Sequence, residues 1–162
     1  HLRGMHAHSE WLAVRNPCRK TQTSGYVPAG GQLAARGAVR VHRAFGGLTH
    51  MIHLLREKAT PEQVQDMLAE YKKMIKVAVD VRRNALAGGG IMHADCEALL
   101  LENGSDQDDI WGANWHPADG RIEFEAVINI RPRLDNRSMI LQSEERRRAV
   151  EAVTRQILGG VR

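Results

Sequence analysis

Aromatic residues and cysteines are scarce in this chain of 162 residues. Phe, Trp and Tyr together make up 4% of it, and the two cysteines are Cys18 and Cys96. So few cysteines exclude a disulfide-rich secreted scaffold and fit a reducing compartment. Cys96 lies among apolar residues and is expected to be a buried, unreactive thiol. No apolar run approaches the ~20 residues that a membrane span needs, and no signal-peptide core precedes the predicted domain, so we expect a cytoplasmic protein.

Acidic residues are almost absent from the first fifty positions, where seven Lys and Arg stand against the single acid Glu10. Residues 51–162 hold 16 basic and 18 acidic residues, so the formal net charge of +4 originates in the N-terminal segment. A domain with a small net negative charge lacks the electrostatic footprint of a nucleic-acid-binding protein. Nucleic acid is therefore not an expected partner.

The N-terminal segment also lacks a sustained helix or strand period, whereas capping signals and apolar periodicity begin directly after Met51. We interpret residues 1–50 as upstream sequence read in frame, with the functional protein starting at Met51. A disordered basic tail and an Arg-rich organellar transit peptide are the alternatives. Residues 51–162 are expected to form one domain, which is long enough to bury a core.

Two helices carry clear start signals. Thr60 begins a capping-box pattern ahead of an apolar stripe, which predicts a helix over residues 61–73. Ser143 is followed by two acids and a second apolar stripe, which predicts a helix near the C-terminus. We interpret the run Arg146–Arg148 as a solvated face of that helix.

Alternating polarity predicts the strands, which cover residues 52–55, 75–81, 93–101, 110–118 and 121–133. A two-residue turn at Asp119 and Gly120 would pair Trp115 with Phe124 in a hairpin. Because a strand is expected after residues 88–90, these three glycines indicate a bend or bulge and not a phosphate loop. The order β-α-β-β-β-β-α predicts an α+β two-layer sandwich, with a mainly antiparallel sheet of about four or five strands and two helices on one face.

One face of this sheet is predicted to carry an acidic row beside a basic row. In the strand predicted over residues 93–101, the polar residues His93, Asp95 and Glu97 alternate with apolar residues. In the strand predicted over residues 121–133, Arg131 and Arg133 lie on the polar face. No recognised catalytic motif has this pattern. The rows indicate a candidate site without a known reaction.

Arginine and asparagine side chains crowd around Pro132 and suit bidentate binding of a carboxylate or phosphate. We therefore expect a binding module for an anionic small molecule or nucleotide. Trp111 or Trp115 would supply a stacking wall if exposed. The expected ligand-binding residues are Asn114, Asn129, Arg131, Arg133, Asn136 and Arg137.

Two other interpretations stay open. His93, Asp95 and Glu97 would converge on one cation in a metal-dependent hydrolase, with His116 or Glu123 as a further ligand. Alternatively, the two rows form only cross-strand ion pairs, which contribute ~0.2–1 kcal/mol each, and no ligand site exists. A protein partner or a second copy of the chain along an open sheet edge is compatible with every interpretation.

Three segments, MHADCEALLLENGS, WGANW and INIRPRLDNRS, together resemble a family of small prokaryotic proteins known only as a domain of unknown function. The resemblance covers residues 52–158. It includes the His and acid cluster of Met92–Glu97, the Trp-Gly-x-Asn segment of Trp111–Asn114 and the Asn-Arg-Ser of the third segment. It implies a domain that starts near Met51, and it brings no activity, cofactor or partner.

Overall fold

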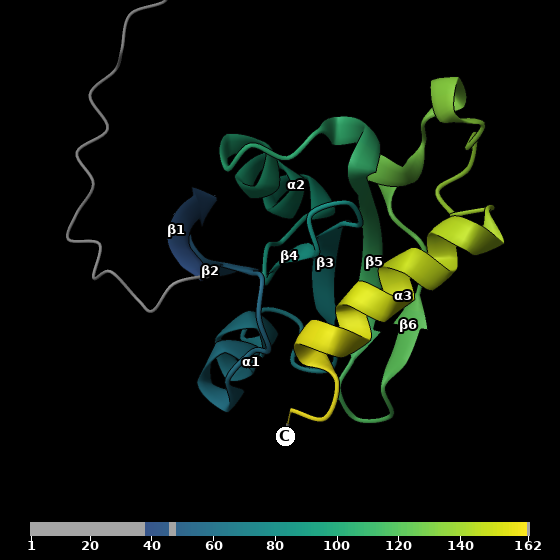
Figure 1. The fold of residues 1–162 in the computed structure, drawn as a ribbon. Coiled ribbons are helices and arrows are strands. Elements are labelled where there is room, and N and C mark those ends of the chain that lie inside the picture. The colour runs from purple at the N-terminus through teal and green to yellow at the C-terminus, as the bar shows by residue number, and fades with distance from the viewer. Residues whose placement is uncertain (1–37, 46–47, 162) are drawn as a thin grey trace, which may run out of the picture. The chain divides into compact units, whose positions relative to one another are not determined.

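Strands of alternating or continuous apolar character form one antiparallel sheet of six strands (Figure 1). This computed structural model describes residues 38–45 and 48–161, all of which belong to the compact unit Leu33–Arg162. The strand order is β1-β2-β4-β3-β5-β6. The strands are Val39–Phe45 (β1), Leu48–Leu55 (β2), Ile75–Asp80 (β3), Ala85–Gly88 (β4), Ile110–His116 (β5) and Arg121–Glu123 (β6).

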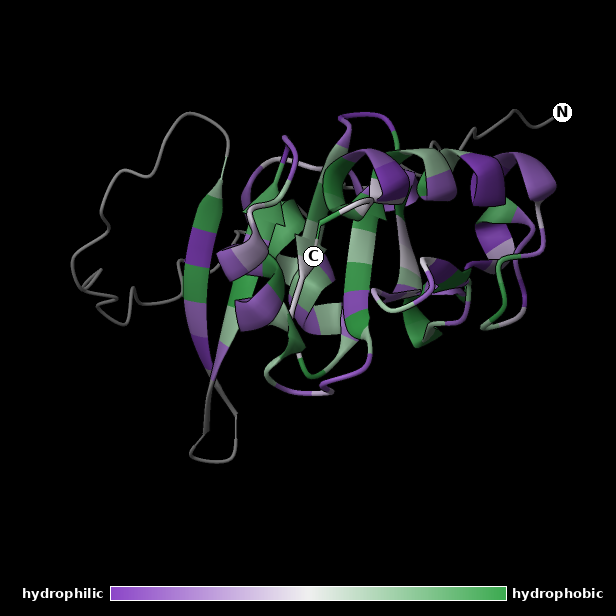
Figure 2. Ribbon diagram, turned by 90° about the horizontal axis from the view of Figure 1, so that it is seen from below, coloured by the Kyte–Doolittle hydropathy of each residue, from purple (hydrophilic) through white to green (hydrophobic). Residues whose placement is uncertain are grey.

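Helices cover both faces of the sheet. Helices α1 (Pro61–Leu68) and α3 (Glu144–Leu158) share a core with Val77 of β3, whereas α2 (His93–Glu102) shares a second core with Ala78. Adjacent residues of β3 divide between the two cores because successive side chains of a strand point to opposite faces. Figure 2 shows the resulting hydrophobic colouring along the central strands and hydrophilic stretches on the helices.

The predicted α+β class with a mainly antiparallel sheet is confirmed. The predicted two-layer arrangement is wrong in one respect, because α2 lies on the face that was expected to carry no helix. The two helices foreseen, α1 and α3, do share one face. The observed element order is β-β-α-β-β-α-β-β-α over the described residues.

Helix α2 replaces the strand predicted over residues 93–101. Its buried residues Cys96, Leu99 and Leu100 recur at i, i+3 and i+4. The segment, which alternates in polarity as a strand would, therefore also fits a helix with one apolar face. Ala and Leu are strong helix formers. The Asp95 carboxylate accepts the N–H of Met92 at 3.0 Å and so stabilises the helix start.

The three glycines consequently connect a strand to a helix, contrary to the prediction that a strand follows them. Gly89 has φ +97°, and a Cβ there would lie 2.5 Å from the carbonyl oxygen of Met51. A bend lies at Ile91 and Met92, directly after the three glycines. The α2 N-terminus already holds the Asp95 carboxylate, so a bound phosphate would meet a negative charge there.

The sheet extends upstream of Met51. Strand β1 pairs with β2 from Val39↔Leu54 to Phe45↔Leu48, so the predicted boundary lies inside β2. The compact unit Leu33–Arg162 therefore includes described residues before position 51. The start of the functional protein at Met51 stays a prediction. The basic tail or transit peptide was predicted for residues 1–50; residues 39–45 and 48–50 of this range form strands, and residues 1–37 lie outside the described structure.

The hairpin of β5 and β6 forms, but its register differs from the prediction by two residues. Trp115 lies opposite Ile122 and not Phe124, because four residues, 117–120, make the turn. A two-residue shift keeps every side chain on its predicted face, so polarity alone does not detect it.

The long second strand predicted over residues 121–133 is wrong beyond Glu123. The chain leaves the sheet there and forms the 3₁₀ helices η2 (Val127–Asn129) and η3 (Pro132–Leu134). Pro132 has no N–H to contribute to a ladder. The predicted basic row is consequently carried by an irregular segment that packs beside α2.

Both predicted helix starts are confirmed. Thr60 Oγ1 accepts the Gln63 N–H at 3.3 Å, and Ser143 Oγ accepts the Arg146 N–H at 3.3 Å. Helix α1 ends at Leu68, earlier than predicted. The prediction that Arg146–Arg148 form a solvated face of α3 is only partly correct. The Arg146 guanidinium lies 4.8 Å from the centroid of the buried Trp111 ring.

Candidate functional site

The three segments that carry the family resemblance meet on the α2 side of the sheet. His93 Nε2 lies 2.9 Å from Asn114 Oδ1, which joins the first segment to the second. Arg131 Nη2 donates to Glu97 Oε1 at 2.7 Å, which joins the third to the first. The Asn129 side chain joins the third segment to the second through Gly112. Tertiary structure thus gathers the segments into one network.

Arg131 is the most constrained member of this network. Its side chain is 6% exposed, its Nε donates to the Ile128 carbonyl oxygen at 2.9 Å, and its guanidinium lies 5.1 Å from the centroid of the Trp111 ring. Burial lowers the pKa of Arg131, and the neighbouring Glu97 carboxylate opposes this shift. Its Nη1 is buried and has no hydrogen-bond partner among the described residues.

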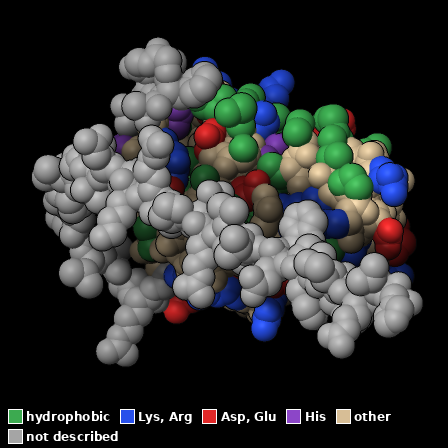
Figure 3. Space-filling model, turned by 90° about the horizontal axis from the view of Figure 1, so that it is seen from above, with side chains coloured by type: hydrophobic (Ala, Val, Ile, Leu, Met, Phe, Trp, Pro, Cys, Tyr) green, Lys and Arg blue, Asp and Glu red, His purple; other side chains and the backbone are tan. Residues whose placement is uncertain are grey.

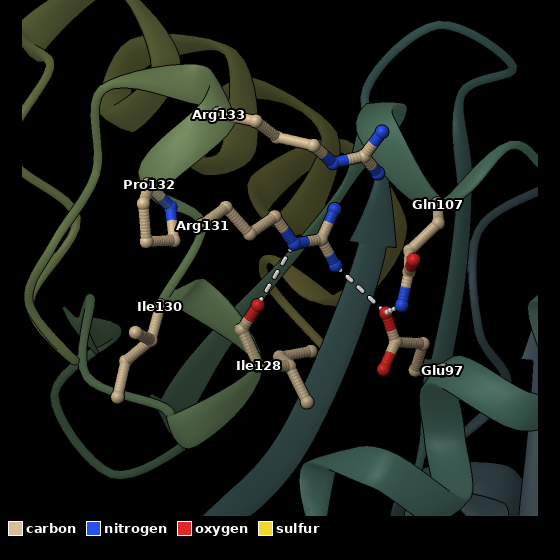
Figure 4. A pocket seen from close by; sticks show the side chains of 7 residues that line it. All are labelled: Glu97, Gln107, Ile128, Ile130, Arg131, Pro132 and Arg133. Carbon is tan, nitrogen blue, oxygen red and sulfur yellow. Dashed lines mark hydrogen bonds and ion pairs between the residues drawn. The ribbon is translucent and has the colours of Figure 1, made fainter.

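A cavity of about 490 Å³ opens beside this guanidinium. In Figure 4 the Arg131 side chain reaches between Arg133, which comes from η3, and Gln107, which comes from the 3₁₀ helix η1 (Gln107–Asp109). The apolar lining consists of Ile128, Ile130 and Pro132, and the polar lining consists of Glu97, Gln107, Arg131 and Arg133. The volume lies within the ~300–1,000 Å³ range typical of small-molecule sites.

The two arginines of the cavity have acidic partners of different exposure. Glu97, with a side chain 11% exposed, pairs with Arg131, whereas Arg133 forms an ion pair with Asp108 in which both side chains are well exposed. The pairing of Glu97 with an arginine was predicted. The cross-strand geometry was not correct, because Glu97 belongs to a helix and Arg131 to an irregular segment.

The predicted ligand-binding asparagines 129 and 136 are used inside the protein and do not line the cavity. Asn129 accepts the Gly112 N–H at 2.8 Å and donates to the carbonyl oxygens of Gly112 and Met139. Asn136 donates to three carbonyl oxygens and accepts the Gln142 N–H. Both side chains are fully buried and hold the irregular segment in place.

Two other predicted ligand-binding residues also lie outside the cavity lining. Asn114 is half-buried and contacts His93, and Arg137 is exposed. Trp111 and Trp115 are each 2% exposed, so neither provides the stacking wall that was conditional on exposure. The structure brings Arg131 and Arg133 together and adds Gln107, whose position in a polar loop gave no sequence signal.

The predicted metal ligands do not converge. On α2, His93 and Glu97 are one turn apart on the same side, whereas Asp95 points elsewhere and caps the helix. His116 Nε2 lies 3.3 Å from Glu123 Oε2, so these two residues pair with each other. In the described ranges, no three His, Cys, Asp or Glu side chains are placed to hold a metal ion. Burial raises the pKa of the Cys96 thiol to about 12, consistent with the inert role expected.

Two histidine–carboxylate pairs between β2 and the α1 region were not foreseen from the sequence. His53 Nε2 lies 3.1 Å from Asp66 Oδ2, and His50 Nδ1 lies 3.0 Å from Glu70 Oε2. Both histidines are buried. Burial lowers the pKa of His53, and the Asp66 carboxylate opposes this shift.

His93 should make folding stability depend on pH. Burial lowers its pKa below the usual 6.5, against the opposing hydrogen bond to the Ala113 carbonyl oxygen. Below pH 6.5 the unfolded chain therefore binds more protons than the folded one, and stability falls as the pH falls. We expect the melting temperature to drop between pH 7.5 and 5.5, and the His93→Gln variant to reduce that drop. NMR titration measures the midpoint directly, and a His93 midpoint at or above 6.5 contradicts this prediction.

Comparison with known proteins identifies a family for this chain. A family model described as a protein of unknown function (DUF5674) matches residues 53–157, which begin in β2 and end within α3. No match was found among curated proteins or among solved structures. None of the helices in the described part of the chain is both long and apolar enough to cross a membrane.

Proposed function

Because this chain belongs to the DUF5674 family, which is described only as a protein of unknown function, we propose a function from its cavity. The protein binds a small molecule through an anionic carboxylate or phosphate group of that molecule. The observation that carries this proposal is the buried Nη1 of Arg131, which has no hydrogen-bond partner among the described residues. An unpaired buried donor costs about 1–3 kcal/mol, and more for a charged group. Because Nη1 is itself buried, a ligand oxygen removes this cost once a neighbouring side chain moves aside.

The Arg131 guanidinium is already oriented for such a ligand. Its Nε and Nη2 are held by the Ile128 carbonyl oxygen and by Glu97, which fixes the plane of the fork. A planar guanidinium binds a carboxylate or phosphate with strong, directional hydrogen bonds. Because the side chain is immobilised before binding, little rotamer entropy is lost when a ligand arrives.

Arg133 supplies a second, adjustable cation at the same cavity. Its side chain is 60% exposed and that of its partner Asp108 is 40% exposed. Exposed pairs of this kind contribute only about 0–1 kcal/mol, so an anion can take the place of Asp108 at small cost. With both tryptophans buried, no described feature favours a nucleobase, and the proposal is therefore confined to the anionic group.

Titrations followed by ¹⁵N–¹H NMR test this proposal, with inorganic phosphate, 4-methylpentanoate and L-leucine as probes. We expect at least one probe to bind at the cavity and the Arg133→Gln variant to weaken it about 10–100-fold, because a charge-assisted hydrogen bond is lost. Arg137→Gln is the matched control, since this exposed arginine lies outside the cavity lining.

Absence of binding by all three probes contradicts the proposal. Equal weakening by the two arginine variants also contradicts it, because attraction would then be a general effect of surface charge and not of the cavity.

A further inference from the structure

The cavity also contains an acceptor without a protein partner. Glu97 Oε1 accepts hydrogen bonds from Arg131 Nη2 at 2.7 Å and from Gln107 Nε2 at 3.3 Å. Its second oxygen, Oε2, has no hydrogen bond within the described residues, and Figure 4 draws none to it. Two residues of the lining, Arg131 and Glu97, thus each have one polar atom without a hydrogen-bond partner among the described residues.

The charged lining of the cavity is mixed in sign. It holds two arginines and one carboxylate: Arg131 pairs with Glu97 inside the lining, and Arg133 pairs with Asp108, which lies outside it. A simple anion would place its charge beside the largely buried Glu97 carboxylate, and like charges in a partly desolvated site repel strongly. A ligand that also carries a cationic group meets no such repulsion, because its cation can contact Glu97.

The remaining wall of the cavity is aliphatic. Ile128, Ile130 and Pro132 provide it, and Ile130 is 45% exposed. Figure 3 shows hydrophobic side chains gathered with basic and acidic ones on the face seen from above. Contact between this wall and an apolar ligand group would remove apolar surface from water.

We propose that the occupant of the cavity is a zwitterion with an aliphatic side chain, of the chemical class of the aliphatic α-amino acids. This inference rests on the proposed function, because it uses the same site. The ligand carboxylate contacts Arg131 and Arg133, the ammonium group contacts Glu97, and the aliphatic side chain packs against Ile128 and Ile130.

Three ligands of matched shape test the charge requirement with the unmodified chain. L-leucine carries both charged groups, 4-methylpentanoate lacks the ammonium group, and isopentylamine lacks the carboxylate. We expect NMR titration to show that L-leucine binds at least about tenfold more tightly than either analogue.

Each alternative result has a separate meaning. If 4-methylpentanoate binds as tightly as L-leucine and Arg133→Gln weakens both, the zwitterion is overturned while the anion-binding function stands. If isopentylamine binds as tightly as L-leucine, or if no probe binds, both proposals are overturned.

A variant of Glu97 tests the same inference through specificity. In Glu97→Gln the ammonium group loses its partner, so we expect the preference for L-leucine over 4-methylpentanoate to fall to about onefold. Glu102→Gln is the matched control on the same helix, because Glu102 lies outside the cavity lining and its side chain is 59% exposed. An unchanged preference in a folded Glu97→Gln variant overturns the assignment. If that variant does not fold, the comparison of ligands on the unmodified chain still decides.

Discussion

Replacing Arg131 with methionine should lower the free energy of unfolding by about 3–5 kcal/mol, because it leaves the Glu97 carboxylate largely buried without its partner. Glu97 and Arg131 side chains are 11% and 6% exposed, so water replaces the lost contact poorly. The variant also loses the hydrogen bond to the Ile128 carbonyl oxygen and the contact with the Trp111 ring. Urea denaturation monitored by circular dichroism measures the change.

Arg133→Met is the matched control, and its cost should stay below about 1 kcal/mol because the Arg133–Asp108 pair is exposed. The double variant Glu97→Leu with Arg131→Met should recover much of the stability lost by Arg131→Met, since no unpaired buried charge remains. Similar costs for the two single arginine variants would mean that the Glu97–Arg131 pair is not desolvated in solution.

Replacing Asn129 with alanine should cost about 3 kcal/mol or more. Its fully buried side chain satisfies the N–H and the carbonyl oxygen of Gly112 and the carbonyl oxygen of Met139. Each buried polar group left without a partner costs about 1–3 kcal/mol. Alanine also leaves a void at the contact between β5 and the irregular segment. Thermal and urea denaturation both report this loss.

Asn114→Ala provides the comparison, because Asn114 is only half-buried and water can reach its partners. We expect a cost of about 1 kcal/mol there. If both asparagine variants lose the same stability, Asn129 does not hold the irregular segment on the sheet. A larger cost at Asn129 than at Asn114 would also exclude Asn129 as a ligand-binding residue, because its side-chain groups would all be used within the protein.

Local signals were sufficient for α1, α3 and β3. The caps at Thr60 and Ser143 are interactions within a few residues, and so the sequence contains both partners of each hydrogen bond. The strand predicted over residues 75–81 is present as β3 (Ile75–Asp80), and it was predictable because its β-branched residues alternate.

Helix α2 was mispredicted because two periods fit the same residues. An apolar set at Cys96, Leu99 and Leu100 fits a helix, while Ala94, Cys96 and Ala98 fit alternate positions of a strand. Small residues at several positions make both patterns plausible. The packing of α2 against β3 and β4 selects the helical period.

The candidate site was partly predictable. Arg131, Arg133 and Glu97 were identified from their sequence patterns, and the structure brings all three to one cavity. Gln107 was not foreseen, and Asn129 and Asn136 were assigned to a ligand although they bond the backbone. Which side chain faces a cavity depends on how the segment after Glu123 folds, and that segment follows no regular period.

The sequence by itself determined the α+β class, the two capped helices, the hairpin faces and the presence of a compact set of charged and amide residues. These properties depend on period, capping and polarity, which act between near neighbours in the chain. Only the tertiary structure decided the helix at His93–Glu102, the two-residue hairpin register and the division of the arginines and asparagines between cavity and core. The helix depends on packing against β3 and β4, and the division of arginines and asparagines depends on contacts between separate segments, such as Glu97 with Arg131 and Asn129 with Gly112. The hairpin register depends on how residues 117–120 turn, because polarity is the same in both registers.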